Sequence, residues 1–475
     1  MHRLRLLIFV SMLLIISPVY AQNAQPGAPG IGDVLMPNLG NGGYDAQHYT
    51  LDLDVDMENN RLDGTATIEA IATQDLSAFN LDFLGFEISD LFVNDHAAEF
   101  TREGRELRVV PVASLLEGDA FTVAVSYNGV PGAELPTHDT FSLGWTNYER
   151  GVFVASEPVG AAAWYPVNDH PLDKATYTFE ITVPEPYVVA ANGLLTDTLV
   201  DDGLITYIWE NTHPMASYLA TINIAEFTEV TEQGPDDLPI RNYFPSRLAE
   251  KAVPVFERTA DMIAFYNEIF GPYPFEAYGV VVADTPLFFA LETQTLSLFG
   301  AQVVPEAVIG EVAGFNEVEI TIAHELAHQW FGNSVSPAQW QDIWLNEGFA
   351  TYASALWLEH DQGPQALRRM MNGFYDRLER RKYTPGTPEF DDLFNTGVYQ
   401  QGAWTLHALR LKVGDDLFFE IIRAYADRFR YGNATTEDFI SVAEEISGQE
   451  LDDLFDAWLY DGGVPERTQI ASQTD

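Results

Sequence analysis

The segment formed by residues 321–333, TIAHELAHQWFGN, constrains the fold and chemistry of this chain more than any other. It contains no proline and predicts a helix. Residues four apart lie on one face of a helix, so His324 and His328 should point the same way, one turn apart. Glu325 follows the first histidine, turned by about 100° around the helix axis. This is the H-E-x-x-H pattern, in which two imidazoles are aimed at one metal ion with a carboxylate beside them.

The expected ends of this helix carry signals of their own. Asn316 can cap the first turn, and Glu319, three residues later, can complete a capping box. Gly332 stands where a helix usually ends. The sequence therefore predicts a helix over about residues 316–331.

Two histidines do not complete a catalytic zinc site, which needs three protein ligands and one position open for water. The third candidate is Glu347, in the segment WLNEGFA. Eighteen residues separate it from His328, enough for a loop through Pro337 and a second helix that packs back. Apolar residues recur there at helical spacing: Phe349, Tyr352, Ala353, Leu356 and Trp357. An ordinary buried histidine pair would not require this second motif, so we favour the metal site.

The composition excludes several classes of function. Asp and Glu number 71 against 24 Lys and Arg, a formal charge of −47, so nucleic acid and anionic membranes are poor partners. Cysteine is absent, which excludes disulfides, thiol nucleophiles and thiolate metal sites. A serine hydrolase is unsupported, because residues 332–336, GNSVS, lack the second glycine of a nucleophile elbow.

The N-terminus predicts export. A basic start precedes an apolar run over residues 6–19, and the small residue Ala21 suits a cleavage site, so residues 1–21 should be a signal peptide. The alternative is an uncleaved membrane anchor, which the short apolar run disfavours. After cleavage we expect an extracellular or periplasmic protein with no stable membrane association. Residues 22–43 are rich in Gln, Pro and Gly and predict a flexible linker.

The chain after this linker divides into a strand-rich part and a helix-rich part. Short segments separated by turn residues predict a mainly antiparallel β domain over residues 44–230. Helical patterns then dominate, so residues 231–475 should form a second, mainly helical domain, and the fold class is α+β. The expected strands are 48–56, 64–73, 78–84, 105–111, 119–127, 173–183 and 203–223, and the expected helices are 247–270, 316–331, 346–361, 363–381, 400–412, 415–429, 435–446 and 451–460.

The metal helix, the eighteen-residue gap and the N-E-G-F-A segment together resemble the aminopeptidase N family of zinc peptidases, which are gluzincins and include the leukotriene-hydrolysing aminopeptidases. The resemblance covers nearly all of residues 44–465. It implies a saddle-like N-terminal β domain, a thermolysin-like catalytic domain and one Zn²⁺ per chain. His324, His328 and Glu347 would bind the zinc ion. Glu325 would take a proton from water and later pass it to the leaving amine.

The resemblance also implies residues that contact substrate. Tyr399, in VYQQG, matches the family's Y-x-x-G tyrosine, which donates to the oxyanion; Gln401 replaces a lysine common there. Residues 289–293, FALET, stand where many relatives have G-x-M-E-N on an edge strand that pairs with substrate backbone. Glu292 would then bind the free α-ammonium, and Ala290, on the same strand, would also contact substrate. The departures from G-x-M-E-N bear on substrate preference rather than on the reaction.

Two segments of the β domain match the family as well. Glu157, in SEP, stands where the family places a glutamate or glutamine that reaches the substrate's amino group. Residues 164–171, WYPVNDHP, precede K-A-T and resemble the P-x-x-D-x-P-x-x-K-A-T signature. We interpret Asp169 and His170 as parts of a proline-bounded turn that positions strands.

These observations favour a secreted, zinc-dependent aminopeptidase that acts on peptides with a free N-terminus. One alternative is a zinc endopeptidase with a thermolysin-like mechanism, because thermolysin uses the same three ligand types. The other is a non-catalytic, peptide-binding relative. The complete set His324, Glu325, His328, Glu347 and Tyr399 speaks against a pure binder, which need not retain it.

Overall fold

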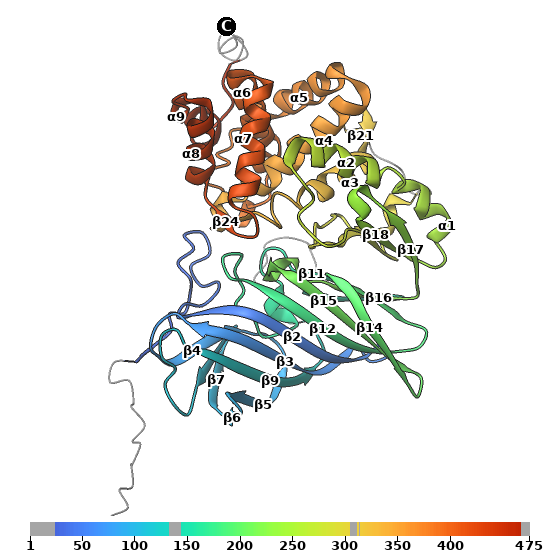
Figure 1. The fold of residues 1–475 in the computed structure, drawn as a ribbon, viewed down its shortest axis with the longest axis vertical. Coiled ribbons are helices and arrows are strands. Elements are labelled where there is room, and N and C mark those ends of the chain that lie inside the picture. The colour runs from blue at the N-terminus through green and yellow to red at the C-terminus, as the bar shows by residue number, and fades with distance from the viewer. Residues whose placement is uncertain (1–23, 133–143, 305–310, 313, 467–475) are drawn as a thin grey trace, which may run out of the picture.

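The computed structural model describes residues 24–132, 144–304, 311–312 and 314–466, which form a β domain and a mainly helical domain (Figure 1). The predicted signal peptide, residues 1–21, lies outside the described residues. The strand-rich domain comes first in the chain and the helical domain second, which confirms the predicted α+β fold class. Within the described residues, no helix is both long and apolar enough to cross a membrane.

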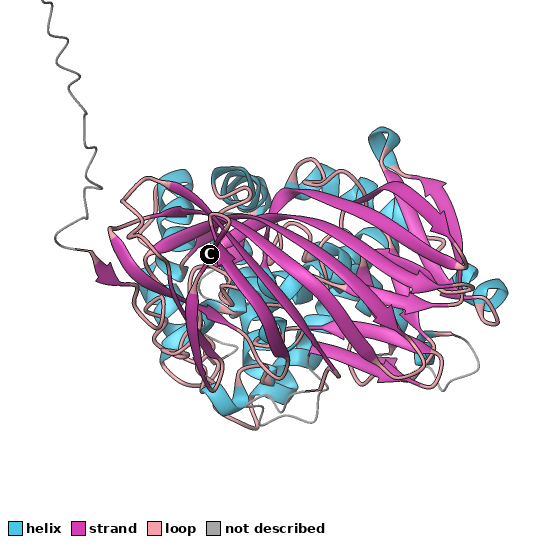
Figure 2. Ribbon diagram, turned by 90° about the horizontal axis from the view of Figure 1, so that it is seen from below, coloured by secondary structure: helices cyan, strands magenta, loops and turns pink. Residues whose placement is uncertain are grey.

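An eight-stranded sheet forms the centre of the β domain, and Figure 2 shows its strands running across the molecule. Its order is β14 (Leu194–Asp201), β15 (Leu204–Ala216), β12 (Lys174–Pro184), β2 (Tyr44–Asp56), β3 (Arg61–Ala72), β9 (Ala120–Gly129), β5 (Glu87–Val93) and β6 (His96–Ala97). Apolar residues of β2 alternate with acidic ones, and the burial alternates in step, because side chains of a strand point to opposite faces. All pairings are antiparallel except β2 with β12.

Two four-stranded sheets complete this domain. One has the order β1 (Gln25–Pro26), β4 (Leu76–Asp82), β8 (Glu106–Val110) and β7 (Glu99–Glu103). The other has the order β10 (Gly144–Tyr148), β11 (Gly151–Ala155), β16 (Ile222–Ala225) and β13 (Val188–Ala191). Strand β11 is buried throughout and ends two residues before Glu157, so it carries that side chain toward the helical domain.

The helical domain begins with a further sheet, β17 (Phe227–Gln233), β18 (Pro239–Pro245), β19 (Val280–Ala283) and β20 (Ser297–Gly300). Its helices are α1 (Ala249–Ala252), α2 (Thr259–Phe270), α3 (Glu317–Ala327), α4 (Trp344–Gln362), α5 (Pro364–Leu378), α6 (Gly402–Val413), α7 (Asp415–Arg428), α8 (Thr436–Ser447) and α9 (Asp452–Phe455). Two short pairs join β21 (Glu311–Val312) to β22 (Phe315–Asn316), and β23 (Ser336–Pro337) to β24 (Asn433–Ala434).

Helix α4 is the core helix of this domain and is buried almost all round. It crosses α6 at two glycines, Gly348 and Gly402. A Cβ atom on Gly348 would lie 2.9 Å from the backbone of Gly402, closer than real Cβ contacts allow. The close crossing therefore requires glycine next to Glu347, and it fixes how far α4 stands from α6.

Two predicted boundaries are wrong. Residues 24–43 are not a flexible linker: β1 pairs with β4, and Asp33, Met36 and Leu39 are buried. Hydrogen bonds from distant parts of the chain hold this segment, and its composition does not show them. The predicted domain boundary at residue 230 falls inside β17, which pairs with β18, so the helical domain begins before this strand.

Candidate active site

Helix α3 starts as predicted but lacks the predicted capping box. The Asn316 side chain accepts a hydrogen bond from the backbone N–H of Val318, at 3.1 Å. The Glu319 carboxylate turns instead to Arg258 Nη1, at 2.8 Å, and to Trp357 Nε1, at 3.0 Å. The cationic guanidinium of Arg258 competes for this carboxylate more strongly than the backbone N–H of the cap does, and the Trp357 indole adds a second donor. This helix start is thus tied to α4, which carries Trp357.

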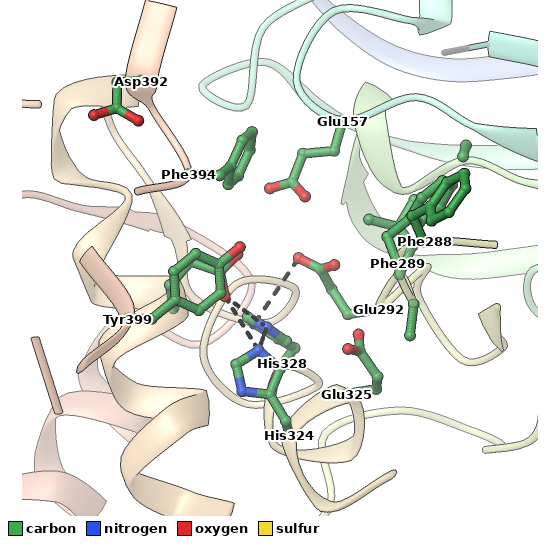
Figure 3. Close-up of a pocket in the computed structure, with 14 residues that line it drawn as sticks. Glu157, Phe288, Phe289, Glu292, His324, Glu325, His328, Asp392, Phe394 and Tyr399 are labelled. Atoms are coloured by element: carbon green, nitrogen blue, oxygen red, sulfur yellow. Dashed lines mark hydrogen bonds and ion pairs between the residues drawn. The ribbon is translucent and has the colours of Figure 1, made fainter. Parts of the chain in front are cut away.

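Helices α3 and α4 bring three potential metal ligands together (Figure 3). His324 and His328 project from α3, and Glu347 projects from the first turn of α4. The Nε2 atoms of the two histidines lie 3.0 Å apart, and Oε2 of Glu347 lies 3.1 Å from Nε2 of His324 and 3.5 Å from that of His328. One donor atom from each residue lies within 4.8 Å of the others. Two imidazoles and a carboxylate are a donor set that zinc accepts.

The orientation of His328 leaves its inner nitrogen free for a metal ion. Its Nδ1 lies 3.0 Å from the carbonyl oxygen of Phe331, which can only accept, so the ring proton is assigned to Nδ1. Nε2 is then the nitrogen that faces His324 and Glu347, and it would bind a metal ion on losing its proton. Such a backbone partner is the usual way in which a metal-binding histidine is held.

The charges around these three side chains favour a cation. Burial by itself raises the pKa of the Glu347 carboxyl, but His328 and His324 outweigh it and lower the pKa to about 2. Burial lowers the pKa of His328, but the carboxylates of Glu292 and Glu347 outweigh this effect and raise it to about 10. The buried carboxylates thus make the space between the donor atoms favourable for positive charge, which suits a divalent cation.

Glu325 is buried beside the three ligands, with 5% of its surface exposed. Burial raises its pKa well above the usual range; His328 opposes this shift, while the carboxylates of Glu292 and Glu347 add to it. A carboxyl with a raised pKa can hold a proton near neutral pH and give it up again. Figure 3 shows this carboxylate on the same side of the cavity as Glu292.

Tyr399 faces the ligands from the opposite wall of the cavity (Figure 3). It lies in the π-helical turn Gly397–Gln401, and its ring stacks on that of His324 with the centroids 6.0 Å apart. Burial, together with Glu347 and Glu157, raises its pKa well above that of a free tyrosine, so the hydroxyl remains a donor. Gln401, in place of the family's lysine, donates to the carbonyls of Trp458, at 2.6 Å, and Gly463, at 2.9 Å. That side chain therefore anchors this turn to the end of the chain.

Glu292 follows a single bridge residue, Leu291, and not a strand as expected, and the segment after α3 holds its backbone in place. Its backbone carbonyl accepts from Gln329 Nε2 at 3.0 Å and from Asn333 Nδ2 at 2.6 Å. Just before it, Leu291 and Leu298 exchange two backbone hydrogen bonds. The carboxylate is directed into the cavity, with Oε1 3.9 Å from Nδ1 of His328 and no hydrogen-bond partner among the described residues.

Glu157 reaches the same cavity from the β domain (Figure 3). Its Oε1 atom is buried and makes no hydrogen bond to any described residue. Burial raises its pKa well above the usual range, and the carboxylates of Glu292, Glu347 and Glu325 raise it further. Two carboxylates with unsatisfied oxygens thus face one space, which would suit a ligand that donates several hydrogen bonds and carries positive charge.

The cavity that contains these residues has a volume of about 510 Å³. All eight site residues singled out by the sequence line it: Glu157, Ala290, Glu292, His324, Glu325, His328, Glu347 and Tyr399. Sequence reasoning missed four lining residues, namely Ala155, Phe288, Asp392 and Phe394. These residues belong to no motif: Ala155 ends a strand, Asp392 ends the short 3₁₀ helix Phe390–Asp392, and the other two lie on loops. Among these four, only Phe288 could have been noticed in the sequence, because it forms an aromatic pair with Phe289 directly before A-L-E.

Comparisons with known proteins agree with this architecture. Residues 45–219 match the family model described as Peptidase M1 N-terminal domain, and residues 255–458 match the Peptidase family M1 domain. Aminopeptidase M1 of Arabidopsis thaliana is 25% identical over 451 residues, covering 88% of this chain and 50% of its own length. Aminopeptidase M1-B of Oryza sativa subsp. japonica is 28% identical over 325 residues, covering 65% of this chain and 37% of its own length. The chain thus spans about half or less of the length of these curated relatives.

Solved structures match over nearly the whole chain. The M1 zinc metallopeptidase from Deinococcus radiodurans is 32% identical, with a TM-score of 0.81 over 90% of this chain and 97% of that one. A mutant of that enzyme bound to a Tyr-Ser-Ala substrate is 31% identical, with a TM-score of 0.83 over 92% of this chain and 99% of that one. The chain belongs to the M1 family of zinc metallopeptidases, whose members hold a single catalytic zinc ion.

Proposed function

We propose that this protein is an exported zinc aminopeptidase that removes N-terminal residues from peptides. The observation that carries the proposal is the layout of one cavity. The zinc-binding group of His324, His328 and Glu347 lies beside two carboxylates, Glu157 and Glu292, whose inner oxygens have no hydrogen-bond partner among the described residues. A peptide with a free α-ammonium would satisfy those oxygens and bring its first peptide bond to the metal.

The proposed reaction is hydrolysis of that peptide bond by water. When bound, zinc supplies a Lewis acid that polarises the scissile carbonyl and lowers the pKa of bound water to about 7. Glu325 takes the proton from the attacking water and passes it to the leaving amine; its raised pKa favours the protonated form that gives the proton to the amine. The Tyr399 hydroxyl donates a hydrogen bond to the oxyanion that develops on the former carbonyl.

The two open carboxylates would determine which end of the peptide binds. A carboxylate hydrogen-bonded to an ammonium group forms a charge-assisted pair, which is stronger than a neutral hydrogen bond. Glu292 is fixed through its backbone to the segment that follows α3, while Glu157 comes from the other domain. Together they would hold the amino terminus at a fixed distance from the metal, so cleavage would occur after the first residue.

A zinc endopeptidase with the same ligands is the nearest alternative, and a peptide-binding protein without activity is the other. A mutant of the Deinococcus enzyme binds a Tyr-Ser-Ala substrate, which supports our proposal that this chain acts on short peptides. An endopeptidase needs space for residues before the scissile bond, and here carboxylates occupy that side of the cavity. A pure binder would have no use for a buried Glu325 beside the metal ligands.

Aminoacyl reporter substrates test the proposal directly. Free and N-acetylated versions of each reporter are compared, with the zinc-loaded protein and after removal of zinc by a chelator. We expect turnover only of the free reporters and only with zinc. Equal rates on acetylated reporters or internal bonds would establish the endopeptidase, and full zinc loading without turnover of any reporter would establish the binding protein.

Export rests on the sequence of residues 1–21, with its apolar run and the small residue Ala21. We therefore propose an extracellular or periplasmic location for the mature chain. Expression of the whole coding sequence, followed by mass measurement of the mature N-terminus, tests this point. A mature chain that starts after Ala21 supports export, and an intact N-terminus retained in the cytoplasm would exclude it.

A further inference from the structure

Residues 24–43 precede the family-matched region and contact both domains. The segment starts at the edge of the β domain, where the backbone N–H of Gly27 donates to the carbonyl of Ala78 at 2.9 Å. Figure 1 shows the dark-blue start of the chain rising from the β domain toward the helical domain. It later returns to the β domain, where the Asn41 N–H donates to the Asn168 side chain at 2.6 Å. The segment is therefore a strap that is fixed at both ends.

Asp33 is the point at which this strap meets the helical domain. Its Oδ1 atom accepts from the backbone N–H groups of Leu35, at 2.8 Å, and Met36, at 2.7 Å, which shapes the strap itself. Its Oδ2 atom accepts from the backbone N–H of Trp340, at 2.7 Å, and from Nε2 of His170, at 3.1 Å. The residue is 3% exposed, so water does not compete for these bonds.

The local structure fixes the proton of His170. The backbone N–H of Leu172 donates to its Nδ1 at 3.1 Å, so Nδ1 is an acceptor and the ring proton is assigned to Nε2. Nε2 then donates to Asp33. The imidazole is thus a neutral donor that links the P-x-x-D-x-P turn to the strap, and Asp33 joins three parts of the chain.

Trp340 connects Asp33 with the metal ligands. It begins the short turn that leads into α4, which carries Glu347 in its first turn. Its ring packs on that of Tyr218 with the centroids 5.3 Å apart. The Tyr218 hydroxyl accepts from Asn346 Nδ2 at 3.3 Å and donates to the carbonyl of Gly332 at 3.1 Å. Trp340 is therefore linked to the neighbour of Glu347 and to the turn that follows His328.

We propose that Asp33 is a positioning residue of the active site. By holding the backbone of Trp340, it sets where α4 begins, and so where the Glu347 carboxylate stands relative to His324 and His328. The strap would act on the metal site rather than on the substrate, because Glu292 and Glu157 are held by other elements. The inference concerns the position of the metal ligands, so its failure would not contradict the proposed substrate, and failure of the proposed substrate would not contradict it.

Asp33→Asn tests this role, because asparagine has a single acceptor oxygen and cannot accept from both the N–H groups of the strap and the N–H of Trp340. Asp56→Asn is the control: Asp56 Oδ1 also accepts from the N–H groups two and three residues later, Glu58 and Asn59, both at 3.0 Å, but Asp56 lies at the exposed end of strand β2 in the β domain. Zinc affinity is measured by competition with a chelator, at a temperature where thermal unfolding shows both variants to be folded. We expect zinc binding about 10-fold weaker in Asp33→Asn, as for other residues that orient metal ligands, and unchanged in Asp56→Asn.

Kinetics supply the second measurement. With excess zinc and a free aminoacyl reporter, Asp33→Asn should lower kcat and leave KM unchanged, because the carboxylates proposed to bind the amino terminus are not displaced. Zinc affinity and kcat equal to those of Asp56→Asn would overturn the proposal. If Asp33→Asn does not unfold cooperatively, Asp33→Glu replaces it, since it keeps the charge and both acceptor oxygens but moves them by one methylene. Weaker zinc binding in Asp33→Glu supports the proposal, and wild-type zinc binding refutes it.

Discussion

The two halves of the cavity hold their carboxylates in opposite ways. In the metal half, Glu347 lies against both histidines, His324 and His328, and its pKa is lowered. In the ammonium half, Glu292 and Glu157 each have a buried oxygen without a partner among the described residues, and their pKa values are raised, first by burial. A buried polar atom without a partner costs about 1–3 kcal/mol. The metal half therefore suits an ion, while the ammonium half keeps unpaired acceptors that the proposed peptide amino terminus would satisfy.

Glu325→Gln, beside the metal ligands, should lower turnover more than any substitution in the ammonium half. The amide cannot accept the proton of water, so kcat should fall by about 10²–10⁴-fold while zinc remains bound. Zinc content by elemental analysis and kcat on a free aminoacyl reporter measure the two quantities. Glu317→Gln, an exposed change in the first turn of the same helix, is the control and should retain full turnover. Wild-type turnover in Glu325→Gln would remove this residue from the chemistry.

Tyr399→Phe should have the next largest effect. It removes the hydroxyl proposed to donate to the oxyanion, and the loss of such a donor lowers kcat by about 10²–10³-fold. KM should change little, because the ring that stacks on His324 remains. Tyr127→Phe is a control for loss of a buried tyrosine hydroxyl, since its hydrogen bond to the Trp164 carbonyl lies within the β domain. An effect of equal size in both variants would show that Tyr399 acts only through stability.

The metal half could be predicted from sequence because it follows local rules. His324 and His328 are one turn apart on one helix, and Glu347 lies on the next described helix, so few chain paths can bring them together. The same holds for long strands such as β2, whose alternation is visible. Strands β7 and β14 are exposed along their whole length, so they lack an alternating pattern and were not predicted.

Features that depend on distant partners could not be predicted. The composition of residues 24–43 is typical of a flexible segment, and only the contacts of Asp33 with Trp340 and His170 explain its fixed path. Asp392, at the end of a short 3₁₀ helix, and Phe394, just after it, reach the cavity through tertiary packing alone. Glu157 could be proposed only from the family resemblance, since an isolated glutamate after a strand carries no signal of its own.

Glu292→Gln and Glu157→Gln test the ammonium half. Each loses one charge-assisted bond to the α-ammonium, worth about 1.5–3 kcal/mol, so kcat/KM on free reporters should fall by about 10–100-fold. Glu276→Gln is the matched control, because Glu276 also has a buried oxygen without a partner among the described residues but pairs with His213 outside the cavity. If either cavity variant keeps the full preference for free over acetylated reporters, that carboxylate does not bind the amino terminus of the substrate.

Phe288→Ala should have the smallest effect and sharpens the boundary of the ammonium half. The Phe288 ring lines the cavity yet is 94% exposed, so it contributes almost nothing to the folded core. A bound peptide with a large apolar first residue could cover it, and loss of that contact should lower kcat/KM by about 10-fold, with a smaller effect for alanyl reporters. The thermal midpoint of Phe288→Ala should equal that of the wild type. The control is Phe100→Ala, on an exposed strand away from the cavity, which should leave both kcat/KM and the preference among reporters unchanged. Because the exposed Phe288 ring cannot alter activity through the core, a selective loss of kcat/KM for large residues would identify it as part of the substrate site, and unchanged kcat/KM for all reporters would place it outside that site.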